Sequence, residues 1–345
     1  MKRSISIVIL NWNGSAYLKQ FLPLLIEKTQ YPEVAIVVAD NGSTDDSLIV
    51  LKEEFPTVKV FPFEENHGFA GGYNRALSLL KSDYYVLLNS DVEVTDNWLQ
   101  PMCDYMNTHE DVAACQPKIK SYIQRDYFEY AGAAGGFLDR YGYPFCRGRI
   151  FGSVERDTEQ YNSIQDVFWA TGACLFIRSD CFWAVQGFDN DFFAHMEEID
   201  LCWRLKSRGW KIACIPESTV YHVGGGTLNM EHPRKTYLNF RNSLFLLYKN
   251  LPENRLRKTL FVRWWLDYIA ACQLFFTGKV QNAKSVFKAR KDYKRMKPHF
   301  NMKRQQNMMQ AKTNAFYELF PKSIVAEYYL KSKKRYADIV KEGKS

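Results

Sequence analysis

The sequence predicts an α/β protein with a doubly wound, mostly parallel sheet and a helical extension at the C-terminus. Apolar strand-like runs alternate with helix-like segments through the first 90 residues, which is typical of parallel sheets with right-handed crossovers. The charge is also divided: residues 231–345 hold 26 Lys and Arg against 8 Asp and Glu, whereas residues 1–230 hold 20 against 30. We therefore expect an acidic α/β domain over residues 1–230 and a basic helical region over residues 231–345.

The individual elements follow from the spacing of apolar residues. Short apolar runs that end in turn residues predict strands, and apolar residues that recur every three or four positions predict helices. The predicted strands lie at residues 5–10, 34–39, 58–61, 84–88, 167–177, 211–215 and 219–222. The predicted helices lie at residues 16–28, 46–54, 73–81 and 197–208, the last closed by Gly209. Between residues 121 and 165 the regular pattern is lost, and the many Gly and Tyr residues predict an ordered functional loop.

Beyond residue 231 the pattern is helical and requires no strand. Residues 255–276 form the clearest helix, because their apolar side chains recur at intervals of three or four and share one face. These side chains are Leu256, Leu260, Trp264, Tyr268, Cys272 and Phe275. Basic helix continues to residue 297 and less regularly beyond it.

The most informative motif is NSDVE at residues 89–93, which ends the fourth predicted strand. In open α/β sheets, ligands bind at the carboxyl ends of the strands. Asp91 and Glu93 have no basic neighbour in the sequence, and such oxygen ligands suit a hard divalent cation, Mg2+ or Mn2+, which would clamp a diphosphate. The structural alternative is a helix N-cap, where Ser and Asp are favoured.

Two other polar loops follow predicted strands. In the turn DNGSTD at residues 40–45, Asp40 can accept hydrogen bonds from a base or a ribose, although helix capping is the commoner use of such a turn. The loop NHGFAGGYN at residues 66–74 offers backbone N–H groups at a helix start, which suits a phosphate. It lacks both the Walker ending and the GxGxxG pattern of dinucleotide enzymes.

Three carboxylates lie at the start of the helix predicted from residue 197. Glu197 and Glu198 point about 100° apart on a helix, so we expect them to have different partners. A carboxylate held among the Phe and Met residues that precede them should have a raised pKa, as a general base requires. Asp200 and Arg204 are four residues apart and are expected to form a structural ion pair.

Together these motifs resemble the family 2 inverting glycosyltransferases with the GT-A fold, especially the rhamnosyltransferase-like bacterial members. The order and spacing of the motifs carry the resemblance, which covers about residues 4–250. The matching stretches are residues 7–14, 38–45, 66–74, 87–93, 171–173, 187–189 and 197–204, together with His222. The resemblance implies a nucleotide-sugar half over residues 1–118 and an acceptor half over residues 119–230.

The resemblance assigns the donor site to residues of the first half. Asn11 and Asp40 would line the nucleotide pocket, with Asp40 on the base. The nucleotide-sugar would be bordered by Asn66, Gly68 and Asn74.

The resemblance also assigns the metal and the base. The family's Asp-x-Asp signature falls on residues 89–91, so Asp91 would hold the metal and Asn89 stands where the family has its first acid. Pairing of Asp91 with Glu93 is the alternative. His222 ends a predicted strand and matches a histidine that assists the metal and the diphosphate, whereas a lone histidine is more often structural. The family's Glu-Asp base motif falls on residues 197–198, which makes Glu198 the expected base and leaves Glu197 a capping or positioning role.

The resemblance implies transfer of a sugar from a nucleoside diphosphate sugar to a hydroxyl of a glycan or lipid-linked acceptor in bacterial surface polysaccharide synthesis. The metal would neutralise the leaving diphosphate, and attack from the opposite face would invert the anomeric carbon. A nucleotidyltransferase that makes nucleotide-sugars is an alternative, but it should carry a Gly-rich basic loop where this chain has NWNG at residues 11–14. A basic nucleic-acid-binding protein is another, but the cations lie on predicted helices, and we expect no nucleic-acid partner.

The basic C-terminal region points to an anionic partner surface. Cations flank the aromatic stripe of the helix at residues 255–276, a pattern that suits helices lying in a membrane interface. These cations are Arg255, Arg257, Lys258, Arg263 and Lys279. A helical cap packed on the catalytic domain is the alternative. The eight cysteines are scattered without CxxC pairs, as in reducing compartments, so we expect a cytoplasmic protein, with the inner face of the plasma membrane as a candidate location.

Overall fold

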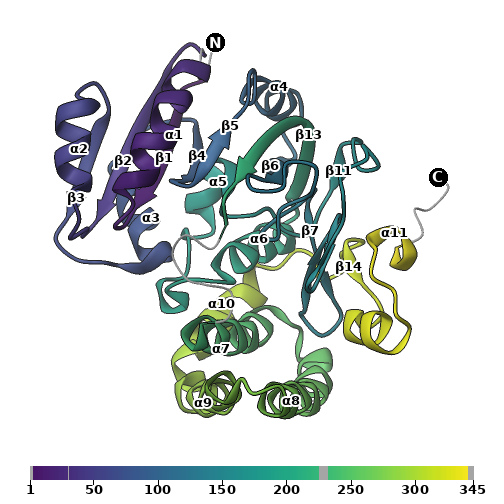
Figure 1. Ribbon diagram of the computed structural model, residues 1–345. Helices are drawn as coiled ribbons and strands as arrows, with labels where there is room; N and C mark the ends of the chain where they lie inside the picture. The colour runs from purple at the N-terminus through teal and green to yellow at the C-terminus, as the bar shows by residue number, and fades with distance from the viewer. Residues whose placement is uncertain (1–2, 30, 225–231, 341–345) are drawn as a thin grey trace.

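The computed structural model describes residues 3–29, 31–224 and 232–340. These residues form a main sheet of nine strands with helices on both faces, a smaller sheet of five short strands, and a layer of helices below them (Figure 1). The predicted α/β architecture with a C-terminal helical extension is confirmed. The division of the chain at residue 230 stays a prediction.

The main sheet combines a parallel half with a mixed half. Its strand order is β11-β13-β6-β12-β4-β1-β2-β3, and β5 pairs with β13. The strands are β1 (Ile5–Asn11), β2 (Val34–Asn41), β3 (Lys59–Phe63), β4 (Tyr84–Asn89), β5 (Val92–Val94), β6 (Val112–Ser121), β11 (Gln165–Asp166), β12 (Cys174–Arg178) and β13 (Lys211–His222). β1 runs parallel to β2 and β4, whereas β12 runs antiparallel to β4 and β6. The carboxyl ends of β1, β2 and β4 therefore meet at one edge, which is where a ligand is expected.

Alternate side chains of the central strands enter two separate cores. Ile7 and Val86 pack into one core, and their neighbours Val8 and Leu87 pack into the other. This alternation is the two-residue period of a strand, and apolar residues at both positions are what a sheet covered on both faces requires.

Each core is closed by its own set of helices. The first core takes α1 (Ser15–Lys28), α2 (Ser47–Glu54) and α4 (Gln100–Thr108). The second takes α3 (Gly68–Ser78), α5 (Ser179–Ala184) and α6 (Glu197–Ser207). α6 ends before Gly209, whose φ of +95° suits glycine, as predicted for the C-terminal end of this helix.

The segment predicted as an ordered loop contains most of the small sheet. Its strands are β7 (Gly136–Asp139), β8 (Pro144–Cys146), β9 (Arg149–Ile150), β10 (Ser153–Val154) and β14 (Leu319–Phe320). The expectation that no strand lies beyond residue 231 is wrong, because β14 pairs in parallel with β7. A two-residue strand is too short to show a period in the sequence. Its place is fixed by long-range contacts such as the hydrogen bond from the Ile324 backbone to Asp139 Oδ2 (2.9 Å).

Three other elements have boundaries that differ from the predictions. The predicted strand at residues 167–177 is regular only from Cys174 onward, and the two predicted strands at 211–215 and 219–222 are one strand, β13. The register of β13 against β6 shifts between Ile215 and Thr219, which explains why the sequence pattern breaks there. α3 begins at Gly68, five residues earlier than predicted.

The C-terminal region is a helical layer that packs on α6 and on the small sheet (Figure 1). It comprises α7 (Pro233–Asn250), α8 (Glu253–Phe276), α9 (Val280–Met296), α10 (Asn301–Gln310) and α11 (Tyr336–Ile339), with one π-helical turn at Ala326–Leu330. The inner face of α8 is buried, so this face packs on the rest of the protein, as the alternative of a helical cap predicted. Arg263 lies on it, paired with Asp267 (3.2 Å), and so does not flank a surface stripe as expected. None of the described helices combines the length and apolarity needed to cross a bilayer.

A buried ionic network joins this layer to α6. Asp200 is fully buried and accepts hydrogen bonds from Arg204, Lys249 and Asn250, each at 2.8 Å. Burial opposes ionisation, but the charges of Lys249 and Arg204 outweigh it and lower the pKa of Asp200. The predicted pair of Asp200 with Arg204 is confirmed as structural. Lys249 also bridges to Asp189 (2.6 Å), so α7 is tied to the segment that precedes α6.

Candidate active site

A cavity of about 1680 Å³ begins at the carboxyl ends of β1, β2 and β4 and continues between the main sheet and the helical layer. Its walls include the ends of β4 and β13, the start of α6, one face of α7 and part of α8. It brings together several of the residues singled out in the sequence. Asn66, Gly68, Asn89, Asp91, Glu197, Glu198 and His222 all line it.

Asn11 and Asp40 lie one layer behind the wall of this cavity. Asn11 Nδ2 donates to Asp40 Oδ2 (2.9 Å), and the Ser43 backbone donates to Asp40 Oδ1 (2.9 Å). Both side chains are buried, and the buried Asn11 Oδ1 has no hydrogen-bond partner. Asp40 thus has the capping geometry of the turn, just behind the end of the cavity formed by β1, β2 and β4. A direct contact with a base would require one of these bonds to be exchanged.

The loop at residues 66–74 is not a free phosphate cradle, and this prediction is wrong. Asn66 Oδ1 accepts from the Gly68 backbone (2.8 Å), and the Phe193 carbonyl accepts from the backbones of Phe69 (2.7 Å) and Ala70 (3.2 Å). The first amides of α3 are therefore used within the protein. Gly68 has a φ of +72°, and a Cβ there would lie 2.6 Å from Phe193, so the two loops require glycine for their close approach.

Asn74 and Glu93 are not brought into the cavity. Asn74 Nδ2 donates to the Phe188 carbonyl (2.8 Å) and thereby ties α3 to the segment before α6. Glu93 lies on β5 and pairs with Arg125 (2.9 Å). Glu93 is therefore a surface ion-pair partner, which leaves Asn89 as the candidate companion of Asp91.

Asp91 and His222 form the charged centre of the cavity. His222 Nε2 lies 3.1 Å from Asp91 Oδ1, and His222 Nδ1 lies 3.2 Å from Glu129 Oε2. Burial disfavours the imidazolium, but the two carboxylates overcome it and raise the pKa of His222 to about 10. Burial likewise opposes ionisation of Asp91, and the hydrogen bond with His222 lowers its pKa. Glu129 was not found from the sequence, because it lies in the segment without a regular pattern.

Glu197 and Glu198 have the opposite electrostatic setting. Burial raises the pKa of Glu198 to about 7, and burial together with the charge of Glu198 raises the pKa of Glu197 well above its usual value. The Oε2 atom of each is buried without a hydrogen-bond partner. Two adjacent carboxylates in a cavity with unpartnered oxygens are suited to accept a proton from a bound hydroxyl near neutral pH.

The backbone before these glutamates is strained. Phe193, His195 and Met196 have φ values of +65°, +69° and +74°, in the left-handed region that such residues avoid. Asn242 on α7 holds this loop, because its Nδ2 donates to the carbonyls of Phe192 (2.9 Å), Ala194 (2.9 Å) and His195 (2.8 Å). Asn242 therefore fixes the start of α6 and with it the position of both glutamates.

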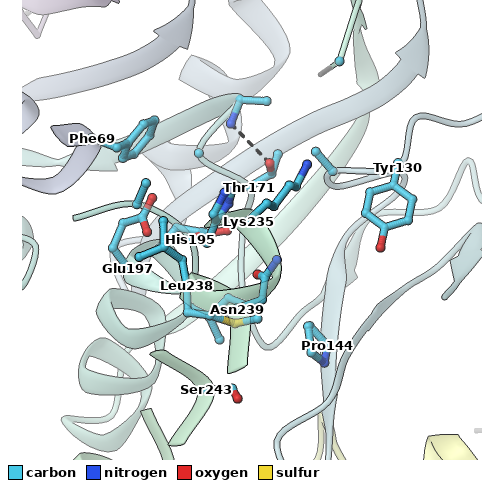
Figure 2. A pocket seen from close by; sticks show the side chains of 18 of the residues that line it. Phe69, Tyr130, Pro144, Thr171, His195, Glu197, Lys235, Leu238, Asn239 and Ser243 are labelled. Atoms are coloured by element: carbon cyan, nitrogen blue, oxygen red, sulfur yellow. Dashed lines mark hydrogen bonds between the residues drawn. The ribbon is translucent and has the colours of Figure 1, made fainter. Parts of the chain in front are cut away.

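The cavity also contains a cation and a neutral imidazole that the sequence did not reveal. Burial lowers the pKa of Lys235, and burial together with the charge of Lys235 lowers the pKa of His195 to about 4. Figure 2 shows both side chains in the cavity with Glu197, and Tyr130 and Pro144 across from them. Lys235 gives this part of the cavity a positive charge that suits an anionic group. Its only sequence signal was membership of the basic C-terminal region.

The family model described as glycosyl transferase family 2 matches residues 6–173. The N-acetylglucosaminyl-diphospho-decaprenol L-rhamnosyltransferase of Mycobacterium tuberculosis is 27% identical over 236 residues, which are 63% of this chain and 75% of that protein. The rhamnosyltransferase WbbL of Escherichia coli K12 is 23% identical over 227 residues, 63% of this chain and 83% of its own. These matches favour glycosyl transfer over the nucleotidyltransferase and nucleic-acid-binding alternatives.

Solved structures support the same fold. The structure of GalNAc-T7 with UDP, GalNAc and Mn2+ matches with a TM-score of 0.58 at 17% identity, over 85% of this chain and 54% of that chain. At this identity the likeness concerns the fold, which is the predicted GT-A type.

The role of Asn242 can be tested by backbone exchange. Asn242→Ala removes three hydrogen bonds from a strained loop, so we expect the amides of residues 193–200 to exchange about tenfold faster or more. Hydrogen–deuterium exchange with mass spectrometry measures this. Asn282→Ala is the control, because Asn282 on α9 donates to Thr236 (2.8 Å), which lies on α7 as Asn242 does. Equal exchange of this loop in both variants would show that Asn242 does not hold it.

Proposed function

We propose that this chain, which belongs to the glycosyl transferase family 2, transfers a sugar with inversion from a nucleoside diphosphate sugar to a hydroxyl of a lipid-linked glycan. The observation that carries the proposal is the pairing, in one cavity, of a charged centre at Asp91 and His222 with two raised-pKa glutamates. The first suits a diphosphate with its cation, and the second suits an acceptor hydroxyl. The reaction needs both.

A divalent cation, Mg2+ or Mn2+, fits the residues at the donor end. Asp91 would supply a carboxylate oxygen and Asn89 an amide oxygen, and both line the cavity. His222 would contribute a ring nitrogen only after losing the proton that it holds beside Asp91. The described residues include no cluster of three His, Cys, Asp or Glu that could hold a metal. This suits an ion bound by one or two protein groups with substrate phosphates and water completing its shell. When bound, such an ion neutralises the charge that develops on the departing diphosphate.

Glu198 is the proposed base and Glu197 its positioning neighbour. Glu198 is only half-buried, whereas Glu197 is 4% exposed, so Glu198 has the better access to a hydroxyl in the cavity. Its pKa of about 7 allows it to take a proton near neutral pH and gives it more driving force than an ordinary glutamate. Glu197 is the more deeply buried of the two, and burial together with the charge of Glu198 raises its pKa, so it is the positioning neighbour of the base. The acceptor oxygen then attacks from the face opposite the diphosphate, which inverts the anomeric carbon.

The proposed acceptor class rests on the sequence relatives and on the positive charge in the cavity. The Mycobacterium tuberculosis relative is named for a diphospho-decaprenol acceptor, and both sequence relatives are named for rhamnose. We therefore take L-rhamnose as the first donor sugar to test and bacterial surface polysaccharide as the pathway product. Lys235 and its neighbour Arg234 line the cavity and offer positive charge to a diphosphate-linked acceptor. Such an acceptor places the enzyme at the inner face of the plasma membrane.

The proposal is tested by incubating the full chain with a panel of nucleoside diphosphate sugars, Mn2+ and polyprenyl-diphosphate-linked N-acetylglucosamine. We expect acceptor-dependent release of the nucleoside diphosphate and a glycosylated lipid with inverted anomeric configuration. Release that does not depend on any acceptor, or no product across the panel, would contradict it.

The donor-end assignment predicts different outcomes for two acidic neighbours. Asp91→Ala should abolish transfer at any Mn2+ concentration, because it removes the carboxylate that faces the cavity. Glu93→Ala should keep transfer within about twofold of the wild type, since Glu93 does not line the cavity and its ion pair with the exposed Arg125 contributes little to the fold. Initial rates across a Mn2+ titration measure both effects. A loss of transfer in Glu93→Ala would restore the alternative metal pair.

Substitution of the two glutamates should have different effects on the rate of transfer in single-turnover assays. Glu198→Gln should keep donor binding but slow transfer by about 100-fold or more, as expected for a missing general base. Glu197→Gln keeps the size and polarity of a buried side chain that is not the proposed base, so we expect at most a modest loss. If Glu197→Gln is the slower variant, the two roles are exchanged.

A further inference from the structure

The outer face of α8 exposes an unusual amount of apolar surface. Six large apolar side chains of this helix are exposed, with Phe276 at 85% and Phe261 at 66%. The six are Phe261, Trp264, Trp265, Ile269, Phe275 and Phe276. Phe261, Trp265, Ile269 and Phe276 recur at intervals of four or seven and so share one face of the helix, which we call the α8 stripe. A soluble monomer rarely exposes a contiguous patch of this kind without a partner.

Positive charge surrounds the α8 stripe. Residues 253–296, which form α8 and α9, contain 11 Lys and Arg but only three acids. Two of these acids, Asp267 and Asp292, are buried against the layer, and the third, Glu253, pairs with Arg257 (3.3 Å) and Arg304 (3.0 Å). The exposed cations include Arg257 and Lys258 near one end of α8, Lys279 beyond the other, and Lys284, Lys288 and Lys291 on α9. An apolar helix face bordered by cations is complementary to a membrane surface with anionic headgroups.

The catalytic cavity reaches the surface next to this stripe. Its far end is lined by Leu266, Ile269 and Ala270 of α8 and by Tyr329 and Leu330 of the π-helical turn. Ile269 is 61% exposed and Leu330 is 83% exposed, so this end lies at the protein surface. Ile269 belongs both to the cavity lining and to the stripe. The same cavity contains Glu197 and Glu198.

We propose that the α8 stripe rests in the headgroup region of an anionic bilayer, so that the cavity between α8 and Ala326–Leu330 opens at the membrane surface. The purpose of this docking rests on the proposed lipid-linked acceptor: the polyprenyl chain stays in the bilayer while its sugar reaches the glutamates. The docking itself is a property of the surface and requires no catalysis. In Figure 1, α8 and α9 lie at the bottom of the molecule and α2 at the opposite end.

Vesicle flotation tests the proposal with the full chain. The stripe variant is Phe261→Ser, Trp265→Ser and Phe276→Ser together, since none of these residues lines the cavity. The matched control is Leu48→Ser with Ile49→Ser, which removes two exposed apolar side chains from α2. We expect the wild type and the control to float with vesicles of phosphatidylcholine that contain about one third phosphatidylglycerol. Binding should weaken with phosphatidylcholine alone or with added salt, and the stripe variant should bind about tenfold less or worse.

Equal flotation of the stripe variant and the wild type, or no flotation of the wild type, would overturn the proposal. Light scattering after gel filtration tests whether a second copy of the chain covers the stripe instead. A wild type that is dimeric and a stripe variant that is monomeric would assign the stripe to a dimer interface.

Nucleoside diphosphate release with a short, water-soluble acceptor separates docking from function. The stripe variant should keep this release while losing transfer to acceptor in vesicles. A wild type that floats but transfers no sugar would contradict the proposed function and leave the docking intact.

Discussion

The side chain of Asn242 is the contact on which the candidate active site depends most. Three residues just before α6 have positive φ values, and a backbone of this kind persists only where its surroundings hold it. The amide of Asn242 donates to three carbonyls in this loop, and the Phe193 carbonyl in turn accepts from the first turn of α3. The loop at residues 66–74, the two glutamates and α7 are thus joined through one short segment. A helix of the C-terminal region therefore helps to shape the candidate active site.

The basic residues of the C-terminal region fall into two groups, one buried within the helical layer and one exposed on its surface. Lys249 and Arg263 are buried and form ion pairs with Asp200 and Asp267, which allows these charged side chains to be buried within the layer. Other cations remain exposed on α8 and α9 around an apolar stripe. Inside the cavity the electrostatics are also divided. At the end of β4, His222 lowers the pKa of Asp91, and the two form an ion pair. At the start of α6, burial raises the pKa of Glu197 and of Glu198, and no cation among the described residues lowers either pKa.

The sequence predicted what depends on local pattern and missed what depends on long-range contacts. Buried strands such as β1 and β4, the helix α8 and the pair of Asp200 with Arg204 follow from periodicity and spacing, and the structure confirms them. Glu129 and Asn242 could not be found this way, because one lies in an irregular segment and the other resembles any polar residue within a helix. The free phosphate cradle failed for a related reason: the Phe193 carbonyl that occupies its amides comes from more than 120 residues further along the chain.

The pH dependence of single-turnover transfer at saturating donor and Mn2+ tests the central claim most directly. If α7 holds Glu198 in its half-buried position with a raised pKa, the wild-type rate should rise with pH around a midpoint of about 7, because only the ionised carboxylate can take the proton. In Asn242→Ala the loosened loop should admit water, lower this pKa toward that of an ordinary glutamate and move the midpoint to lower pH, with a reduced maximal rate. A wild-type midpoint near that of an exposed glutamate, or the same midpoint in both proteins, would contradict the account.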